Sequence, residues 1–203
     1  MIGEKINFKK LKFSDPKHVS VKESVFPFNR FPGVDLILGP EMKSTGEVMG
    51  IDKNFSIAFA KAQISSGINL PVSGTVFISV KDKDKKPIIK LSKKLIDIGF
   101  CIFATKGTAK YLEERNIQVI KIKKVYEGSP NVVDALRKNK IQLVINTTEG
   151  SESIADSFSL RRTTLKKNIP YYTTIAGAIA AVDAIKSISR GDMRIKSLQS
   201  HIL

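Results

Sequence analysis

The sequence predicts an α/β fold after Pro71, with a five-stranded parallel sheet covered by helices on both faces. In this region short apolar runs alternate with segments whose apolar residues recur every three or four positions. Runs that are apolar throughout are typical of strands buried on both faces, as in parallel sheets. The composition agrees, because 42% of the 203 residues are hydrophobic and 26% are charged, which is enough to build a core.

Residues before this region predict less regular structure. Residues 1–22 are polar and rich in Lys without a sustained period, and glycines and prolines interrupt the chain from there to Asp52. We therefore expect irregular structure in both stretches. A segment so short and so often interrupted has too little apolar surface to fold alone, so residues 1–70 are expected to be the end of a larger domain.

One helix is predicted inside this first segment, in the stretch NFSIAFAKAQISSG. Asn54 is expected to cap it, because its side-chain oxygen can accept a hydrogen bond from the first free N–H groups. The apolar residues that fall on one stripe, and that we expect to be buried together, are Phe55, Ala58, Phe59 and Ala62.

Five strands and five helices are predicted after Pro71, in a Rossmann-like alternation. The strand candidates are Thr75–Val80, Cys101–Thr105, Gln118–Ile122, Gln142–Thr147 and Pro170–Thr174. Asp84 and Pro87 open the first helix, Gly99 ends it, and Ile88, Leu91, Leu95 and Ile98 share one of its faces. The other helices are expected at Thr108–Arg115, Asn131–Asn139, Glu152–Lys167 and Ala176–Ser187. Together they make one domain of about 125 residues, a common size.

The stretch CIFATKGTAKYL joins the second predicted strand to its helix. Gly107 is expected to adopt backbone angles closed to other residues, and Thr105 and Thr108 supply hydroxyl groups. The start of the helix adds N–H groups and the positive end of its dipole. The turn therefore predicts a site for an anion such as phosphate.

Polar residues follow every predicted strand. They are Ser79 and Lys81–Lys85, then Thr105–Thr108, then Lys123 and Lys124, then Asn146–Thr148, and finally Thr173 and Thr174. Ligands of open α/β sheets bind beyond the carboxyl ends of the strands, so these residues are expected to form one rim. Lysines suit a phosphate, and Asn and Thr suit a sugar and base edges. This combination indicates a nucleoside monophosphate.

The charge and the cysteine content exclude several other functions. The net charge of +15, from 34 basic and 19 acidic residues, favours anionic ligands, but no aromatic residues interleave with the lysines as a base-stacking surface for nucleic acid requires. The single Cys101 leaves no disulfide and no Cys-based zinc site, and we expect it to be core. No apolar run is long enough to span a bilayer, and no secretory signal is present, so a cytoplasmic protein is expected.

Four segments carry a resemblance to a known family. They are PFNRFPGVDLILGPEMKSTGEVMGID, FATKGTAKYL, KVYEGSPNVVDALRKNKIQLVINTTEG and YYTTIAGAIAAV. From about Val21 onward the chain resembles the C-terminal end of the large subunit of carbamoyl phosphate synthetase, most specifically in GPEMKSTGEVMG. The resemblance implies that residues 1–70 are the last part of the second ATP-grasp unit and that residues 71–203 are a methylglyoxal-synthase-like allosteric domain.

The resemblance also implies ligands and partners. In that family this domain binds UMP as inhibitor and IMP as activator, and ornithine binds where it meets the ATP-grasp unit. The complete enzyme is a ligase that uses ATP with Mg or Mn to make carbamoyl phosphate for arginine and pyrimidine biosynthesis. Its other parts are the rest of the large subunit and a glutamine-amidotransferase small subunit. The ATP loop and the magnesium-binding carboxylates are missing here, so no catalytic or metal-binding residue is expected in this chain.

The family's ligand residues can be placed on this sequence. The nucleotide site falls on Ser79, Lys85, Thr105, Thr108, Lys124, Asn146, Thr148, Asp156 and Thr174. The ornithine site falls on Glu23, Tyr171 and Thr173. Most of the nucleotide residues are those that already follow predicted strands, and Lys124 is expected to contact the phosphate.

Two alternatives stay open. The first is a freestanding nucleotide sensor, which would look the same in sequence. The second is a methylglyoxal synthase, a lyase that needs an aspartate as general base. In the matching stretch this chain has Pro130 where that enzyme carries the base, and Glu149 falls on its second functional aspartate. Loss of a positioned base costs about 10²–10⁴ in rate, so this activity is not expected.

Overall fold

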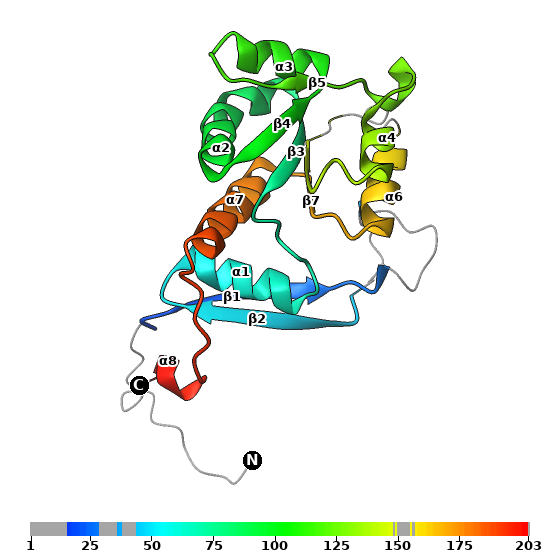
Figure 1. The fold of residues 1–203 in the computed structure, drawn as a ribbon. Helices are drawn as coiled ribbons and strands as arrows, with labels where there is room; N and C mark the ends of the chain where they lie inside the picture. Colours follow the sequence, from blue (N-terminus) through cyan, green and yellow to red (C-terminus); the bar gives the residue numbers. More distant parts are fainter. Residues whose placement is uncertain are drawn as a thin grey trace, which may run out of the picture.

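The computed structural model describes residues 16–28, 36–37, 44–147, 149, 155 and 157–202, and its centre is a five-stranded parallel sheet (Figure 1). The strands are β3 (Gly74–Ser79), β4 (Phe100–Ala104), β5 (Ile120–Lys121), β6 (Leu143–Asn146) and β7 (Tyr171–Tyr172). Their order across the sheet is β5-β4-β3-β6-β7, and every neighbouring pair is parallel. The predicted sheet is therefore confirmed, although β5 and β7 are shorter than expected.

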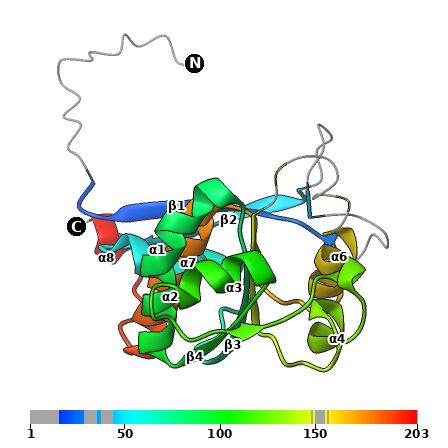
Figure 2. The same cartoon turned by 90° about the horizontal axis from the view of Figure 1, so that it is seen from above.

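Helices cover both faces of this sheet, as predicted (Figures 1 and 2). The helices α2 (Lys85–Ile98), α3 (Lys106–Glu113) and α7 (Ile175–Ser189) contribute to one buried cluster, whereas α4 (Val132–Arg137) and α6 (Phe158–Lys166) contribute to a second. The remaining short elements are η3 (Asp82–Asp84), η4 (Val125–Glu127) and α8 (Gln199–Ile202). The start of the helix expected at Glu152–Lys167 lies partly outside the described residues, and its described part is α6.

Alternate side chains of the central strands belong to different buried clusters. Val76 and Ile78 of β3 are in the cluster with α2 and α7, whereas Phe77 between them is in the cluster with α4 and α6. Successive side chains of a strand point to opposite faces, so each central strand serves both clusters. All four residues of β6 are buried as a result.

The N-terminal part of the chain forms a two-stranded antiparallel hairpin with a helix packed on it. The strands β1 (Val19–Val25) and β2 (Gly46–Asp52) pair along their whole length, from Val19 opposite Asp52 to Val25 opposite Gly46. The expectation of irregular structure up to Asp52 was wrong for these residues. The two strands are far apart in sequence, and the pairing of such segments leaves no local period that a single stretch reveals.

Helix α1 (Phe55–Ser65) lies between this hairpin and α7 (Figure 1). Its cap is as predicted, because Asn54 Oδ1 accepts a hydrogen bond from the Ser56 N–H at 2.9 Å. Its buried stripe differs from the prediction. Phe55 is 49% exposed, and the buried residues are Ala58, Ala60, Ala62 and Gln63. A helix covered on two sides buries small residues on both of them, so a single stripe does not describe it.

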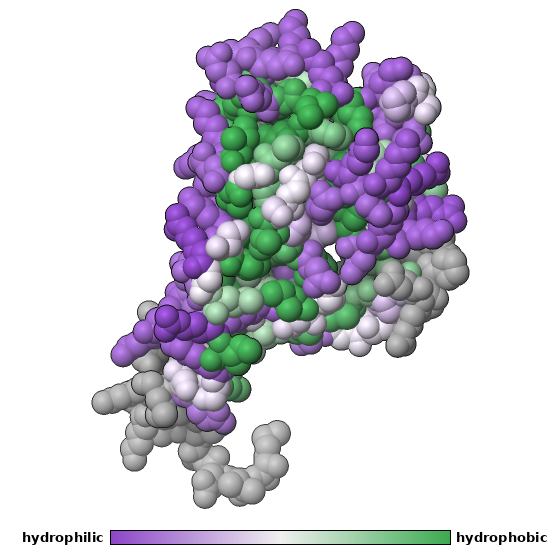
Figure 3. All heavy atoms as spheres, in the orientation of Figure 1, coloured by the Kyte–Doolittle hydropathy of each residue, from purple (hydrophilic) through white to green (hydrophobic). Residues whose placement is uncertain are grey.

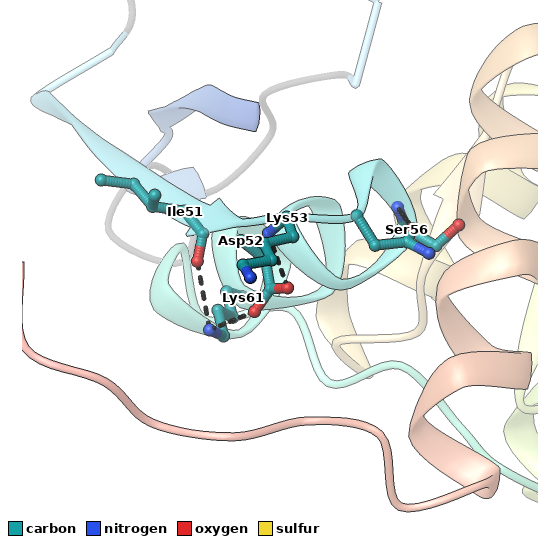
Figure 4. A network of polar contacts seen from close by, with 6 residues as sticks. Ile51, Asp52, Lys53, Ser56 and Lys61 are labelled. Carbon is teal, nitrogen blue, oxygen red and sulfur yellow. Dashed lines mark hydrogen bonds and ion pairs between the residues drawn. The ribbon is translucent and has the colours of Figure 1, made fainter. Parts of the chain in front are cut away.

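An ion pair joins β2 to α1 (Figure 4). Lys61 Nζ lies 2.8 Å from Asp52 Oδ2 and donates a hydrogen bond to the Ile51 carbonyl oxygen at 3.1 Å. The Lys53 N–H donates to the other Asp52 oxygen at 2.8 Å. Burial raises the pKa of Asp52, but the hydrogen bond and the charge of Lys61 lower it more, so the net pKa lies below its usual range. This pair fixes the end of β2 on the helix.

Cys101 is exposed, so its assignment to the core was wrong. It lies in β4 as expected, but its neighbours Phe100 and Ile102 point into the core and Cys101 points to the other face. The adjacent strand β5 has only two residues and pairs with Phe103 and Ala104, so it does not extend alongside Cys101. Separately, no helix among the described residues is long and apolar enough to cross a membrane.

Candidate nucleotide pocket at the strand ends

A pocket opens at the carboxyl ends of β3, β4 and β6. Strand β3 pairs with β4 on one side and with β6 on the other, so chain order reverses at this point of the sheet. Open α/β sheets bind ligands at this kind of position. We call it the strand-end pocket, and its described lining residues are Phe77, Ser79, Val80, Lys81, Thr105, Lys124, Val125, Tyr126, Val132, Asn146, Thr147, Glu149, Ser157 and Leu160.

The pocket is small and mixed in character. Its volume is about 160 Å³, below the about 300–1,000 Å³ of typical small-molecule sites. Phe77, Val132 and Leu160 give it an apolar floor that belongs to the second core cluster. A phosphate and part of a sugar match this volume, and the rest of a nucleotide would extend across the open mouth.

Hydroxyl groups connect the ends of β3 and β4. Ser79 Oγ and Thr105 Oγ1 lie 3.1 Å apart, and Thr108 Oγ1 accepts a hydrogen bond from the Val80 N–H at 3.2 Å. Thr105 and Thr108 are both buried. These contacts hold the start of α3 against β3, so the position of this turn is fixed before any ligand binds.

The start of α3 follows directly after Thr105, which lines the pocket. The first hydrogen bond of the helix runs from the Ala109 N–H to the Thr105 carbonyl oxygen at 2.7 Å, so the N–H groups of the three preceding residues come before the helical ladder. Gly107 lies within α3, and it is not among the residues with a positive φ. The expectation of special backbone angles there was wrong. The attraction for an anion rests on the helix start, not on the glycine.

Asn146 lies at the end of β6, and its amide is held by two hydroxyl groups. Its Nδ2 donates to Tyr171 Oη at 2.6 Å and to Ser157 Oγ at 3.2 Å. These bonds use both amide hydrogens, and no described residue donates a hydrogen bond to the amide oxygen, so this oxygen can accept one from a ligand. The next residue, Thr147, accepts the Lys81 N–H at 3.2 Å.

Two ammonium groups lie beside the pocket, with different partners. Lys81 Nζ lies 3.8 Å from Glu149 and 4.0 Å from Asp84. Lys124 Nζ lies 5.5 Å from the centre of the Tyr126 ring, and no carboxylate of the described residues lies within 4.0 Å of it. Lys124 is therefore the cation that can pair with a bound anion at the smallest cost in lost contacts.

Glu149 is the one carboxylate among the described residues of the pocket lining. Its Oε1 accepts a hydrogen bond from Lys83 Nζ at 2.8 Å. This bond, together with the charges of Lys81 and Lys83, lowers the pKa of Glu149. A carboxylate with a lowered pKa is a weaker base, so Glu149 is poorly suited to act as a general base.

The structure brings together four of the nine residues predicted for a nucleotide: Ser79, Thr105, Lys124 and Asn146. Thr108 lies directly behind them. Lys85 instead pairs with Asp82 at 2.7 Å, and Thr174 caps α7 by accepting the Gly177 N–H at 3.1 Å. Thr148 and Asp156 lie outside the described residues. Lys81 and Thr147 also line the pocket, and both follow predicted strands.

The three residues predicted for ornithine do not form one cluster. The Tyr171 hydroxyl accepts a hydrogen bond from Asn146 of the strand-end pocket, and Thr173 is exposed. Glu23 of β1 accepts a hydrogen bond from Gln63 Nε2, and Gln63 Oε1 accepts the Tyr172 hydroxyl at 2.8 Å. Neighbouring residues of a strand point to opposite faces, which places Tyr172, not Tyr171, with Glu23.

The Glu23–Gln63–Tyr172 chain is partly buried, and burial changes its titration. Burial raises the pKa of Glu23, and the hydrogen bond from Gln63 offsets part of this effect. Burial, with a smaller effect of the Glu23 charge, also raises the pKa of the Tyr172 hydroxyl. Sequence reasoning did not identify Gln63 and Tyr172. A polar Gln among the small apolar residues of α1 was the available signal.

The chain is similar in sequence to several known proteins. Residues 87–173 match the family model of the MGS-like domain. The chain is 55% identical over 185 residues to the carbamoyl phosphate synthase large chain of Rhizobium meliloti. The aligned region covers 91% of this chain and 16% of that protein. It is also 50% identical over 190 residues to the carbamoyl phosphate synthase large chain, C-terminal section, of Methanocaldococcus jannaschii. That aligned region covers 93% of this chain and 31% of the other protein.

The match to a similar section from Aquifex aeolicus is of the same kind, with 50% identity over 93% of this chain and 35% of that protein. The chain therefore spans only about a third or less of the relatives that it resembles. Among solved structures, the methylglyoxal synthase of Elizabethkingia anophelis aligns with 56% of this chain and 79% of its own, at 19% identity and a TM-score of 0.45.

Proposed function

The chain is homologous to the C-terminal section of carbamoyl phosphate synthase large chains and carries an MGS-like domain, and from this premise we propose that it is the nucleotide-sensing regulatory section of such a synthase. Its ligands are nucleoside monophosphates of the UMP and IMP type. They bind in the strand-end pocket and are not converted. The observation that supports this most is the meeting of Ser79, Thr105, Lys124 and Asn146 from four separate chain segments in one pocket.

The phosphate of the nucleotide binds between Lys124 and the start of α3. The ammonium group supplies a charge, Thr105 supplies a hydroxyl at 3.1 Å from that of Ser79, and the helix start supplies N–H groups and a positive dipole end. The Asn146 amide oxygen accepts from the sugar or from a base N–H. The apolar floor of Phe77, Val132 and Leu160 lies beneath the remaining part of the ligand.

The test is a calorimetric titration of the whole chain with UMP and with IMP, in the wild type and in Lys124→Ala. A charge-assisted hydrogen bond contributes about 1.5–3 kcal/mol, so the variant is expected to bind roughly ten- to a hundredfold more weakly. Lys123→Ala is the matched control. It removes the same charge from the adjacent residue, whose side chain lines a different groove. Equal affinities for the wild type and Lys124→Ala would refute the assignment of the phosphate site.

The second part of the proposal is association with the rest of a synthase. The hairpin β1–β2 has only two strands, and such a hairpin is marginally stable by itself. Its edges are the natural place for further strands from the preceding ATP-grasp unit, and the Glu23–Gln63–Tyr172 chain then lies next to the joint. In the complete enzyme this joint contributes to an ornithine site, and ATP with Mg or Mn acts in the other parts, together with a glutamine-amidotransferase subunit.

This association is tested by co-expression with the upstream part of a large chain. We expect the two pieces to purify together and the hairpin to resist a protease that cuts it in the separate chain. A chain that resists cleavage throughout and binds no upstream section would support the freestanding nucleotide sensor instead.

Methylglyoxal synthase activity is not proposed, for reasons of chemistry. Pro130, which stands where that enzyme has its base, lines a groove with Lys123 and Asn131, not the strand-end pocket. Glu149 is held by Lys83 at 2.8 Å and has a lowered pKa. Proline has no proton-accepting side chain and Glu149 is a weakened base, so we expect release of phosphate from dihydroxyacetone phosphate only at the uncatalysed rate.

A further inference from the structure

We propose a second anion site, for a chain of two or more phosphate groups, in a groove between α4 and α6. We call it the basic groove and define it by its polar lining residues, which are Arg137, Ser159, Arg162, Thr163, Lys166 and Lys167. Its volume of about 610 Å³ lies within the about 300–1,000 Å³ of small-molecule sites. Hydrophilic side chains gather on the side of the molecule where α4 and α6 lie (Figures 1 and 3).

One face of α6 supplies most of the groove. Ser159, Arg162, Thr163 and Lys166 recur at intervals of three and four residues, so they lie along one stripe of the helix. The alternate face of α6, with Leu160, Arg161 and Thr164, is buried. Phe158, which is 41% exposed, adds an apolar wall at one end.

Lys167 fixes the two walls of the groove relative to each other. Its Nζ donates a hydrogen bond to the Arg137 carbonyl oxygen at 3.0 Å and another to the Asn139 side chain. The end of α6 is thereby joined to the end of α4, and the side chains of Arg137 and Arg162 line the same cavity. The cations are thus gathered by defined contacts between two helices.

The cations of the groove make no ion pair with a carboxylate in the part of the chain that the structure describes. No Asp or Glu there lies within 4.0 Å of Arg137, Arg162 or Lys166. The carboxylate of Asp134 in α4 accepts hydrogen bonds from Ser129 at 2.9 Å and from the Asn131 N–H at 3.1 Å. These bonds lower the pKa of Asp134, and the charges of Arg137 and Lys138 lower it further, so this carboxylate offsets part of the positive charge. Lys138 and Lys140 on the neighbouring groove add further positive charge.

Helix dipoles explain only part of this gathering. A cation in the last turn of a helix is favoured by the dipole, which accounts for Arg137 and Lys166 individually. Arg162 lies in the middle of α6 and gains nothing from it. Two guanidinium groups, each able to bind a phosphate with two parallel hydrogen bonds, together with two ammonium groups match the charge of a short phosphate chain better than that of one phosphate.

The basic groove is separate from the strand-end pocket. The two share no lining residue, since α6 contributes Leu160 to the pocket and its other face, from Phe158 to Lys166, to the groove. The site therefore does not depend on the nucleotide pocket, and each can be disabled alone. A ligand here would be a second effector of the section proposed above, so the inference concerns the same protein but stands on different residues.

The test is titration of the whole chain with inorganic tripolyphosphate at near-physiological salt, where weak surface attraction is screened. We expect saturable binding, weakened at least tenfold in Arg137→Gln/Arg162→Gln. The matched control is Lys90→Gln/Lys93→Gln, which removes the same charge from exposed positions of α2 and should change affinity less than twofold. The same loss in the double variant is expected with millimolar UMP present to occupy the strand-end pocket, which separates a failure here from a failure of the nucleotide proposal.

Further arms identify the source of the phosphate chain. In one arm, ATP replaces tripolyphosphate. If ATP binds and the double variant weakens this binding equally, the ligand of the groove is the phosphate tail of a nucleotide. If tripolyphosphate binds and ATP does not, the ligand is an inorganic chain. If the double variant unfolds, Lys166→Gln alone replaces it and should still weaken binding. Absence of binding at millimolar tripolyphosphate, equal losses in the control, or binding of duplex DNA without tripolyphosphate would each overturn the proposal.

Discussion

The parallel sheet and the β1–β2 hairpin bury their residues in different ways. Every residue of β6 is buried, because helices cover both faces of the sheet. In β1 no residue is buried, and half-buried residues alternate with exposed ones, because α1 packs on one face of the hairpin. A sheet enclosed on both faces can hold a site rigidly at its edge, whereas the hairpin depends on its contact with one helix.

That dependence is concentrated at Gly50. A Cβ at this position would lie 2.0 Å from the Ala58 carbonyl oxygen and 2.6 Å from the Ala62 nitrogen, closer than real Cβ atoms approach. The hairpin can pack on α1 only because this residue has no side chain. The strand-end pocket contains no comparable contact, since a Cβ on Gly107 would meet nothing within 4 Å.

The largest effect that would sharpen this comparison is expected from Gly50→Ala. Because main-chain atoms must move to admit the methyl group, we expect a loss of about 1–3 kcal/mol or more in the free energy of unfolding. The loss should fall on the hairpin and α1, so proteolysis should begin there while β3–β7 stay protected. Urea denaturation with hydrogen exchange measures both quantities.

Gly46→Ala is the matched control, because a Cβ on Gly46 in the same strand would meet nothing within 4 Å. Its effect should stay within about 0.5 kcal/mol of the wild type. Equal destabilisation by the two substitutions would mean that the close approach of β2 to α1 is not what holds the hairpin.

A smaller effect concerns pH. Burial raises the pKa of Glu23 in the folded chain, and the hydrogen bond from Gln63 reduces this shift. A carboxyl whose pKa is raised by folding binds its proton more tightly when folded, so its contribution to stability is present at low pH and is lost as the pH rises through the folded pKa. The ordinary Glu pKa is about 4.3, so the loss is expected between about pH 4 and neutrality.

Glu23→Gln removes the titration and keeps an acceptor for Gln63. The thermal midpoint of the variant, relative to that of the wild type, should therefore increase as the pH rises. The difference between the two midpoints should vanish toward about pH 4. Ser24→Ala, at the exposed neighbouring position, should follow the wild type at every pH. A difference that grows as the pH falls would contradict the burial of Glu23.

The sequence was sufficient to predict the parallel sheet, because buried strands such as Leu143–Asn146 are apolar up to their last residue and amphipathic helices separate them. The sequence was insufficient to predict the hairpin, because its two strands are distant in sequence. They pair from Val19 opposite Asp52 to Val25 opposite Gly46. The sequence also misplaced Cys101, because this side chain points to the face opposite that of the buried Phe100 and Ile102, and the sequence does not show how far helices cover that face. Both errors concern contacts between segments distant in sequence.

The candidate site was predicted to a similar extent. Polar residues at strand ends are visible in sequence, and Ser79, Thr105, Lys124 and Asn146 do line one pocket. The sequence could not show which strand-end residues have other partners. Lys85 forms an ion pair with Asp82, and Thr174 accepts a hydrogen bond from the Gly177 N–H. The pairing of Glu23 with Tyr172 through Gln63 depends on the geometry of three separate elements.

The most direct test of the central claim, that nucleoside monophosphates bind in the strand-end pocket, is hydrogen exchange with and without UMP. The account predicts slower exchange in the segments 79–81, 105–108 and 124–127 and around Asn146, with no change in the hairpin or in the basic groove. Protection confined to the basic groove, or no protection at millimolar UMP in a folded protein, would contradict it.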